Sequence, residues 1–303
     1  MKIDEVRRVF SVGAGTMGQQ IALQCAMHGY EVTIYDISPD TLRDAAAKVR
    51  TYAASLLEQK RITPDASNAA LSRISFTSRP EDAATADLLT ESIPEDPDLK
   101  AKVFAQFNKI CPSRTIFTTN TSTLLPSMYA GETGRPGQFA ALHFYQTVWD
   151  ANLVDIMPHS GTDPDTVELL RVFARRVGQV PLVLKKEHAR YVMNDFLEAI
   201  NTTAMRLLQS GVASVEEIDR AFMIVMHVPI GPFGSLDYVG LDTVWHIVQS
   251  NARVTRSAEI QAQADEFKTK YIDKGLLGVK AGKGFYTYPN PAYRRPGFLM
   301  EDL

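Results

Sequence analysis

The residues best suited to proton transfer in this sequence are a histidine and an aspartate twelve positions apart. His143 lies near the end of the apolar run Phe139 to Phe144, and Asp155 interrupts the apolar run LVDIMP. A carboxylate inside an apolar strand is costly unless it is paired, which makes Asp155 more informative than an exposed acid. On adjacent strands, the imidazole could take a proton while the carboxylate fixes its tautomer and stabilises the imidazolium. A purely structural histidine is the alternative, and spacing alone does not separate the two.

A second set of residues predicts a dinucleotide site. The spacing Gly-x-Gly-x-x-Gly follows directly after the apolar run Val9 to Val12. In such a turn the first glycine makes the bend, the second lets a pyrophosphate approach the backbone, and the third lets helix and strand pack closely. The helix that follows would direct its free N–H groups at the pyrophosphate. The candidate cofactor-binding residues of this turn are Gly13, Ala14, Gly15, Thr16, Met17 and Gly18.

An acid at the end of the next expected strand indicates which dinucleotide binds. Asp36 follows the strand expected at Glu31 to Tyr35 and lies 18 residues after Gly18. That is close to the roughly 20 residues expected for a carboxylate that bonds the ribose hydroxyls of NAD. A 2′-phosphate would be repelled there, and no arginine directly follows Asp36. We therefore expect NAD rather than NADP, with a structural glycine turn in another parallel-sheet protein as the alternative.

Small polar side chains end a further expected strand. The run Thr115 to Thr119 leads into Asn120, Thr121 and Ser122. In a doubly wound sheet, ligands bind outside the carboxyl ends of the strands, so these side chains could face a cofactor or a substrate. Ordinary turn chemistry explains the same residue types equally well.

Composition excludes several classes of function. The net charge of −3 gives no reason to expect nucleic acid or an anionic membrane surface as partners. The two cysteines, Cys25 and Cys111, fall in segments expected to be buried, which fits a reducing cytosol better than a disulfide framework. No apolar run is close to the length of about 18 residues that a membrane-spanning helix needs. No signal peptide is expected before the first strand. We expect a cytoplasmic protein that binds a small-molecule substrate and has no metal site.

The elements divide into two parts. At 303 residues the length suggests two domains of about 150 residues each. Alternating strands and helices predict an N-terminal Rossmann domain over residues 1–186, with a doubly wound, mostly parallel sheet. An all-helical C-terminal domain is expected over residues 187–303. Its expected helices are Tyr191 to Leu208, Val215 to Val228, Ser235 to Gln249, and Ser257 to Lys274.

A protruding pair of helices is expected within the first domain. Helical spacing runs from Thr41 to about Ile62, and a second helix near Ala66 to Ser72 would fold back on the first. The cations Lys60 and Arg61 lie at the tip of the pair. They could contact a phosphate of a bulky substrate, or simply form a solvated helix end.

Taken together, six motifs resemble the L-3-hydroxyacyl-CoA dehydrogenase family. They are GAGTMG, NTS, LHF with an acid twelve positions after the histidine, MND, GPFGSLDYVGLDT and GVKAGKGFYTY, and they cover nearly the whole chain in order. The resemblance implies that His143 is the general base, that Asp155 is its partner, and that Ser122 and Asn194 hold the substrate oxygen. It also implies a homodimer formed through the helical domain. The further residues that it implies as NAD contacts are Glu95, Lys100, Gln146 and Lys280.

Several positions depart from the family pattern. Asp155 replaces a glutamate and is shorter by about 1.5 Å, so we expect a displaced or weakened contact with His143. The family's Phe-Phe-Asn after the histidine reads Phe144, Tyr145 and Gln146 here, and Trp149 stands where the substrate should approach. Where a CoA-facing lysine is often found, this chain has Gln59, with Lys60 about 100° further round a helix.

These features leave three functions open. The first is NAD-dependent oxidation of a short-chain L-3-hydroxyacyl-CoA, or the reverse reduction, with Lys60 as a candidate substrate contact. The second is oxidation of a free 3-hydroxy acid, because PEDPDLKAKVFAQ and LLPS are similar to gulonate dehydrogenase. The third is a structural or regulatory NADH-binding protein, which the set His143, Asp155, Ser122 and Asn194 argues against.

Overall fold

The computed structural model describes residues 1–300, without the side chains of 250, 251 and 253–255. The chain forms two compact units, Met1–Tyr191 and the part from Val192 onward. The sequence predicts a domain boundary after residue 186, and this boundary stays a prediction.

The strands described in the first unit form one sheet. They are β1 (Arg8–Val12), β2 (Glu31–Tyr35), β3 (Ile74–Thr77), β4 (Leu88–Glu91), β5 (Ile116–Thr119), β6 (Phe139–Phe144), β7 (Leu153–Pro158) and β8 (Val180–Val183). Their order is β3-β2-β1-β4-β5-β6-β7-β8, and neighbouring strands are parallel except for the antiparallel pair β6 and β7. The first six strands in this order have Rossmann topology, in which the winding reverses between β1 and β4. The doubly wound, mostly parallel sheet predicted from the sequence is confirmed.

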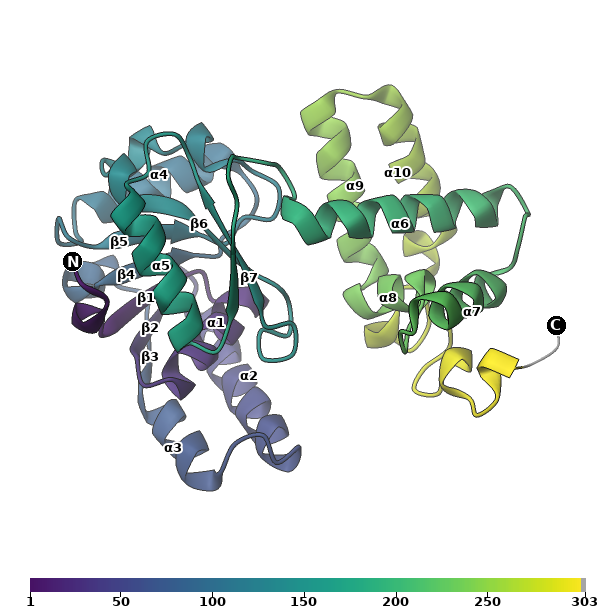
Figure 1. Cartoon of the computed structure of the whole chain (residues 1–303), viewed down its shortest axis with the longest axis horizontal. Helices are drawn as coiled ribbons and strands as arrows, with labels where there is room; N and C mark the ends of the chain where they lie inside the picture. Colours follow the sequence, from purple (N-terminus) through teal and green to yellow (C-terminus); the bar gives the residue numbers. More distant parts are fainter. Residues whose placement is uncertain (301–303) are drawn as a thin grey trace. The chain divides into compact units, whose positions relative to one another are not determined.

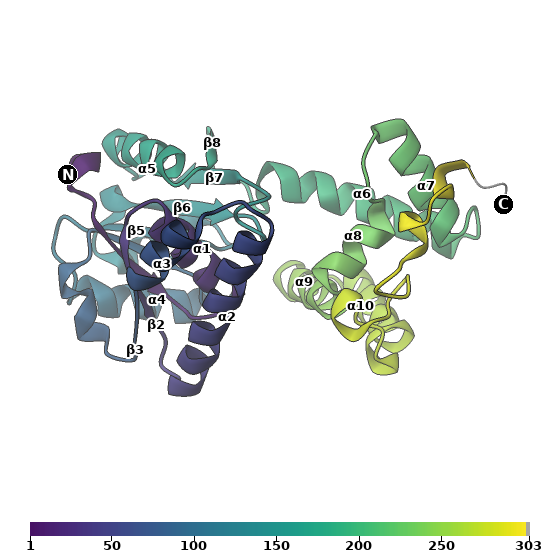
Figure 2. The ribbon, with the colours of Figure 1, turned by 90° about the horizontal axis from the view of Figure 1, so that it is seen from below.

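Helices cover both faces of this sheet (Figures 1 and 2). They are α1 (Thr16–Met27), α2 (Pro39–Glu58), α3 (Pro64–Ser72), α4 (Pro97–Asn108) and α5 (Pro164–Arg176). Buried residues of α1, α2 and α5 form one apolar core, and Phe104 and Phe107 of α4 belong to another. Successive strand residues alternate between the two faces, as Ile116 and Phe117 of β5 do. The sheet is therefore buried between two helical layers, and its strand ends remain to form a site.

The helical pair α2 and α3 projects from the sheet, as predicted (Figure 1). The side chain of Ser38 caps α2 by accepting a hydrogen bond from the Thr41 N–H at 3.2 Å. The helix ends at Glu58, four residues before the expected Ile62. Lys60 then has a left-handed backbone with φ of 57°, so it lies beyond the helix. The prediction that Lys60 continues the rotation of the helix is therefore wrong.

The second unit consists of helices and short turns. Its helices are α6 (Tyr191–Gln209), α7 (Val215–Met226), α8 (Pro232–Val239), α9 (Leu241–Thr255) and α10 (Ala258–Lys270). The single helix predicted from Ser235 to Gln249 is wrong, because Gly240 has a φ of 97° and separates α8 from α9. Among the described helices, none combines the length and the apolar character that a membrane crossing requires.

Two buried aspartates explain the glycine-rich motifs of the second unit. Asp219 accepts hydrogen bonds from the N–H groups of Phe233 and Gly234 at the start of α8, at 2.8 and 2.9 Å. Asp237 accepts from the N–H groups of Phe285 and Tyr286, at 2.9 and 2.8 Å. Burial raises the pKa of both carboxyl groups above their ordinary value, and these hydrogen bonds oppose the rise. The motifs GPFGSLDYVGLDT and GVKAGKGFYTY thus hold the helical unit together.

Candidate active site

The glycine turn after β1 has the shape that a pyrophosphate needs. A methyl group added to Gly18 would lie 1.9 Å from the carbonyl oxygen of Gly13, and one on Gly13 would lie 2.6 Å from that of Ser92. On Gly15, the same group would meet nothing within 4 Å. Gly13 and Gly18 are therefore required by packing, whereas Gly15 faces open space at the N-terminus of α1. This arrangement fits a dinucleotide phosphate that approaches the backbone at Gly15.

Asp36 lies beside this turn. Its carboxylate accepts hydrogen bonds from the N–H of Ala14 and from the N–H of Ser38, both at 3.0 Å. The acid at the end of β2 is thus tied to the glycine turn, where a ribose attached to the pyrophosphate would lie. It remains half-exposed, so part of the carboxylate is open to a ligand.

The pairing of β6 with β7 brings His143 and Asp155 together. The two residues are direct cross-strand partners. Their strand neighbours Leu142 and Ile156 point into the apolar core on one face of the sheet. His143 and Asp155 therefore both point to the other face of the sheet. His143 is 3% exposed and Asp155 is fully buried. The Nδ1 of His143 lies 3.4 Å from the Oδ2 of Asp155, which is longer than the roughly 3.2 Å limit of an ordinary N–H···O bond. The long distance agrees with the short side chain at position 155.

Two tyrosines that sequence reasoning missed surround this histidine. The hydroxyl of Tyr145 donates to Oδ2 of Asp155 at 2.6 Å, and its ring meets the imidazole edge with centroids 4.7 Å apart. The ring of Tyr191 stacks on the imidazole with centroids 4.3 Å apart and planes 8° apart. Tyr191 is buried, which raises the pKa of its hydroxyl well above the ordinary value. The period-two pattern of a strand could have found Tyr145, because it follows His143 by two positions.

The end of β5 supplies the other side of the site. The Oγ of Ser122 lies 3.3 Å from Nε2 of His143, and the Ser122 N–H donates to Glu95 at 2.5 Å. Thr121 donates its hydroxyl to the same carboxylate. The side-chain oxygen of Asn120 accepts from the Phe144 N–H at 2.8 Å, which joins the ends of β5 and β6. Ser122 is therefore held at the histidine by its own N–H bond to Glu95 and by the side-chain bonds of Thr121 and Asn120, which precede it.

Lys100 lies in the interior rather than at the surface. It is 1% exposed, and its Nζ donates to Glu91 at 2.6 Å and to the carbonyl oxygen of Ile93 at 3.2 Å. It also forms an ion pair with Glu95 at 3.4 Å. Burial raises the pKa of Glu91, while the charge of Lys100 and three hydrogen bonds oppose the rise. Lys100 thus positions Glu95, and direct contact of either residue with NAD stays a prediction.

The remaining predicted residues are exposed, have other partners, or belong to the second unit. Gln146 is exposed just after β6, and Trp149 packs its ring on Tyr52 of α2. Asn194 is half-exposed on α6, and Lys280 forms an ion pair with Asp242. Asn194 and Lys280 are described within the second unit, and their roles stay predictions.

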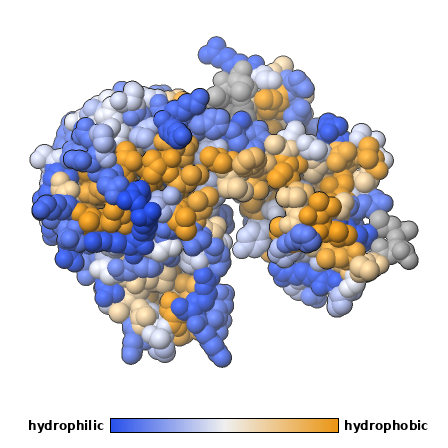
Figure 3. All heavy atoms as spheres, in the orientation of Figure 1, coloured by the Kyte–Doolittle hydropathy of each residue, from blue (hydrophilic) through white to orange (hydrophobic). Residues whose placement is uncertain are grey.

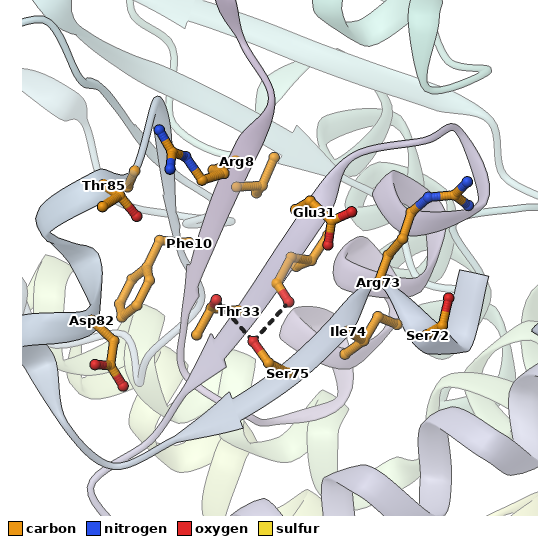
Figure 4. A pocket seen from close by; sticks show the side chains of 13 residues that line it. Arg8, Phe10, Glu31, Thr33, Ser72, Arg73, Ile74, Ser75, Asp82 and Thr85 are labelled. Atoms are coloured by element: carbon orange, nitrogen blue, oxygen red, sulfur yellow. Dashed lines mark hydrogen bonds between the residues drawn. The ribbon is translucent and has the colours of Figure 1, made fainter. Parts of the chain in front are cut away.

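A shallow pocket lies at the opposite ends of the strands (Figure 4). Arg8 and Glu31, which begin β1 and β2, line it together with Arg73 and Asp82. Figure 4 shows Thr33 and Ser75 joined by a hydrogen bond across β2 and β3, at 3.0 Å. Charges of both signs line this pocket, and the histidine and the glycine turn do not contribute to it. We therefore place the candidate active site at the carboxyl ends of the strands.

Comparison with known proteins agrees with this geometry. Residues 8–188 match the family model of the 3-hydroxyacyl-CoA dehydrogenase NAD binding domain, and residues 191–288 match that of the C-terminal domain. A 3-hydroxybutyryl-CoA dehydrogenase of Bradyrhizobium diazoefficiens is 30% identical over 283 residues, which cover 93% of this chain and 96% of the relative.

Two solved structures extend the comparison. A diketoreductase, described as catalysing dual reactions of dicarbonyl compounds, is 39% identical, with a TM-score of 0.85 over 93% of this chain and 99% of its own. The (S)-3-hydroxybutyryl-CoA dehydrogenase of Ralstonia eutropha is 29% identical, with a TM-score of 0.81 over 94% of this chain and 100% of its own. The chain therefore belongs to the 3-hydroxyacyl-CoA dehydrogenase family of NAD-dependent oxidoreductases.

Proposed function

We propose that this protein interconverts a 3-hydroxyl group and a 3-ketone at the site formed by His143, Asp155 and Ser122, with a short-chain L-3-hydroxyacyl-CoA as substrate. The observation that carries the proposal is the line of contacts from Ser122 Oγ through the imidazole to Asp155, with distances of 3.3 and 3.4 Å. Hydroxyl, imidazole and carboxylate in this order form an oriented proton-transfer group.

Each side chain has a defined part in the proposed reaction. Asp155 favours the tautomer of His143 that carries its proton on Nδ1, which leaves Nε2 free to take the proton of the 3-hydroxyl. Ser122 would donate a hydrogen bond to the oxygen as its charge changes. The same role for Asn194 stays the expectation that the family resemblance gives. Bound NAD supplies the hydride acceptor. In the reverse direction the imidazolium returns its proton to the carbonyl oxygen.

The family supports a CoA ester as the handle, and the tip of the helical pair offers a cation for it. Lys60 stands exposed just beyond α2. Its neighbour Arg61 is already engaged, because it pairs with Asp150 and donates to the carbonyl oxygen of Trp149 at 2.6 Å. Lys60 is therefore the residue of this pair that we assign to a substrate phosphate.

A second substrate class is favoured by a specific observation. The structural relative with 39% identity is a diketoreductase that acts on dicarbonyl compounds, and this identity exceeds the 30% shared with the 3-hydroxybutyryl-CoA dehydrogenase. Gln59, in place of the expected lysine, also weakens the argument for CoA. The alternative proposal is reduction of a free 3-keto acid or diketone at the same site.

A panel of substrates tests the proposed function. NADH oxidation would be followed by absorbance with acetoacetyl-CoA, acetoacetate, a free 1,3-diketone and, in the oxidising direction with NAD, L-gulonate. Turnover of acetoacetyl-CoA with a kcat/KM far above that for acetoacetate supports the CoA ester. Turnover of the free compounds alone overturns the CoA assignment, and no turnover with any of them overturns the proposed reaction.

We propose further that the chain forms a homodimer through its helical unit. Large apolar side chains are exposed there, among them Val212, Phe196 and Val225, which are 68%, 60% and 73% exposed. Figure 3 shows hydrophobic residues at the surface of this unit. Exposed apolar surface of this kind is typical of subunit contacts. Sedimentation at micromolar concentration tests this, and a monomer overturns it.

Both cysteines are unpaired and buried, which supports the cytoplasmic location that we propose.

A further inference from the structure

The carboxylate of Asp155 is held by fewer contacts than a buried charge usually has. Its Oδ2 receives the Tyr145 hydroxyl at 2.6 Å and lies 3.4 Å from Nδ1 of His143. Its Oδ1 is buried and has no hydrogen-bond partner among the described residues. The short contact to Tyr145 is therefore the main restraint on the rotation of this carboxylate.

We propose that Tyr145 is a positioning residue for proton transfer, whose hydroxyl holds the short side chain of Asp155 against the Nδ1 side of His143. The proposal rests on the proposed function for the role of His143. It extends that function by assigning a task to a residue outside the set Ser122, His143, Asp155 and Asn194.

The reach of the side chains explains why such a residue is needed. An aspartate ends about 1.5 Å short of a glutamate on the same strand position. A carboxylate that only approaches the imidazole at 3.4 Å gains little from that contact, so it would rotate without a second donor. Tyr145 supplies this donor on the same oxygen that faces the imidazole. The phenol hydroxyl thereby keeps that oxygen directed toward Nδ1.

Two aromatic rings restrict the orientation of the His143 imidazole. Tyr191 stacks on one face of the imidazole, and its hydroxyl donates to the Thr121 carbonyl oxygen at 2.8 Å. Tyr145 meets the imidazole edge at an interplanar angle of 76°. Ser122 faces Nε2, and Glu95 is the nearby acid, bonded to Ser122 and Thr121. Apart from Asp155, the groups that surround the ring hold its plane but do not bond Nδ1.

The test compares Tyr145→Phe with Asp155→Glu and with the double variant. Tyr145→Phe should lower kcat about tenfold, the size expected for the net effect of one hydrogen bond, and leave the KM for NADH unchanged. Asp155→Glu should also lose activity, because the longer side chain is forced against the Tyr145 hydroxyl. In the double variant the glutamate reaches the imidazole without that hydroxyl, so kcat should return to within about threefold of wild type. Tyr30→Phe is the matched control, for which unchanged kinetics are expected, because Tyr30 lies just before β2 and packs on Phe173.

A spectroscopic readout separates this proposal from the proposed function, because it needs no substrate. The ¹⁵N chemical shifts of the His143 ring report which nitrogen of the neutral imidazole carries the proton. Wild type should hold the proton on Nδ1, and Tyr145→Phe should move part of the population to Nε2. Unchanged tautomers in Tyr145→Phe overturn the proposal, even if kcat falls. Losses of kcat that simply multiply in the double variant overturn it as well. If wild type turns over no substrate, the tautomer measurement still decides the role of Tyr145.

Discussion

The Oγ of Ser122 lies 3.3 Å from the Nε2 of His143, although the two residues lie at the ends of different strands. β5 and β6 are parallel neighbours, so their carboxyl ends meet at one edge of the sheet. The Asn120 side chain bonds the Phe144 N–H and joins these ends directly. The geometry of the proton-transfer group is thus set by strand pairing together with the loop contacts that hold Ser122 to Glu95.

Replacing His143 with glutamine should abolish turnover and spare cofactor binding. Loss of a positioned general base costs about 10²- to 10⁴-fold in rate, so we expect kcat to fall by about 10³. The glycine turn follows β1, whereas His143 lies on β6, so the Kd for NADH should stay within about twofold of wild type. Fluorescence titration measures this Kd. Substantial turnover by His143→Gln would place the base elsewhere.

Gly15 and Gly18 should respond differently to the same substitution. The methyl group of Gly15→Ala meets nothing within 4 Å, so the melting temperature should not change. NADH binding should weaken at least tenfold, because the methyl group occupies the space of the pyrophosphate. In Gly18→Ala the added carbon lies 1.9 Å from a carbonyl oxygen, so we expect a loss of stability of about 3 kcal/mol. Calorimetry and NADH titration check both, and a Gly15→Ala variant with normal NADH affinity would contradict the placement of the pyrophosphate.

Asp36 should discriminate between the two nicotinamide cofactors. A charge-assisted hydrogen bond is worth about 1.5 to 3 kcal/mol, so Asp36→Ala should weaken NADH binding about tenfold or more. NADPH binding should weaken less, because the repulsion of its 2′-phosphate is removed together with the acid. Fluorescence titration with both cofactors measures this.

The matched control for this prediction is Asp36→Asn. The amide oxygen can still accept from the Ala14 N–H, so the turn keeps its support while the charge is removed. The Kd ratio of NADPH to NADH should therefore fall in Asp36→Asn as well. Equal losses for both cofactors in both variants would mean that Asp36 only supports the turn.

The sequence predicted the first unit well, because strong local signals agree there with the fold. Glycine spacing, buried apolar runs and an acid at a strand end each have one simple structural explanation, and β2 and β6 have the predicted limits. The structure also places His143 beside Asp155 on adjacent strands, the arrangement considered from the sequence, although spacing alone left a structural histidine as an equal alternative.

Long-range contacts explain what the sequence did not show. Tyr191 reaches the imidazole from a residue 48 positions later in the chain, and no local pattern marks it. The burial of Lys100 depends on Glu91, a carboxylate that looks like an ordinary strand residue in the sequence. The break between α8 and α9 depends on the backbone angle of Gly240, whereas apolar spacing continues through it. Apolar periodicity records which side faces a core, but not where a helix bends.

Lys60 should separate the two substrate classes. Its ammonium group is exposed at the tip of the helical pair, so a contact with a CoA phosphate would be a surface ion pair worth about 0.2 to 1 kcal/mol. Lys60→Ala should therefore raise the KM for acetoacetyl-CoA by about two- to fivefold and leave the KM for acetoacetate unchanged. Because the interaction is exposed, the effect should shrink as salt is raised from low to physiological ionic strength.

The control for Lys60 is Lys48→Ala, which removes an exposed cation from the middle of α2. A general loss of positive charge would raise the KM for acetoacetyl-CoA equally in both variants, since long-range attraction depends little on the position of the charge. A direct contact would affect Lys60→Ala alone. Equal effects would make Lys60 an ordinary solvated cation, and a free diketone or 3-keto acid would then become the better-supported substrate of this site.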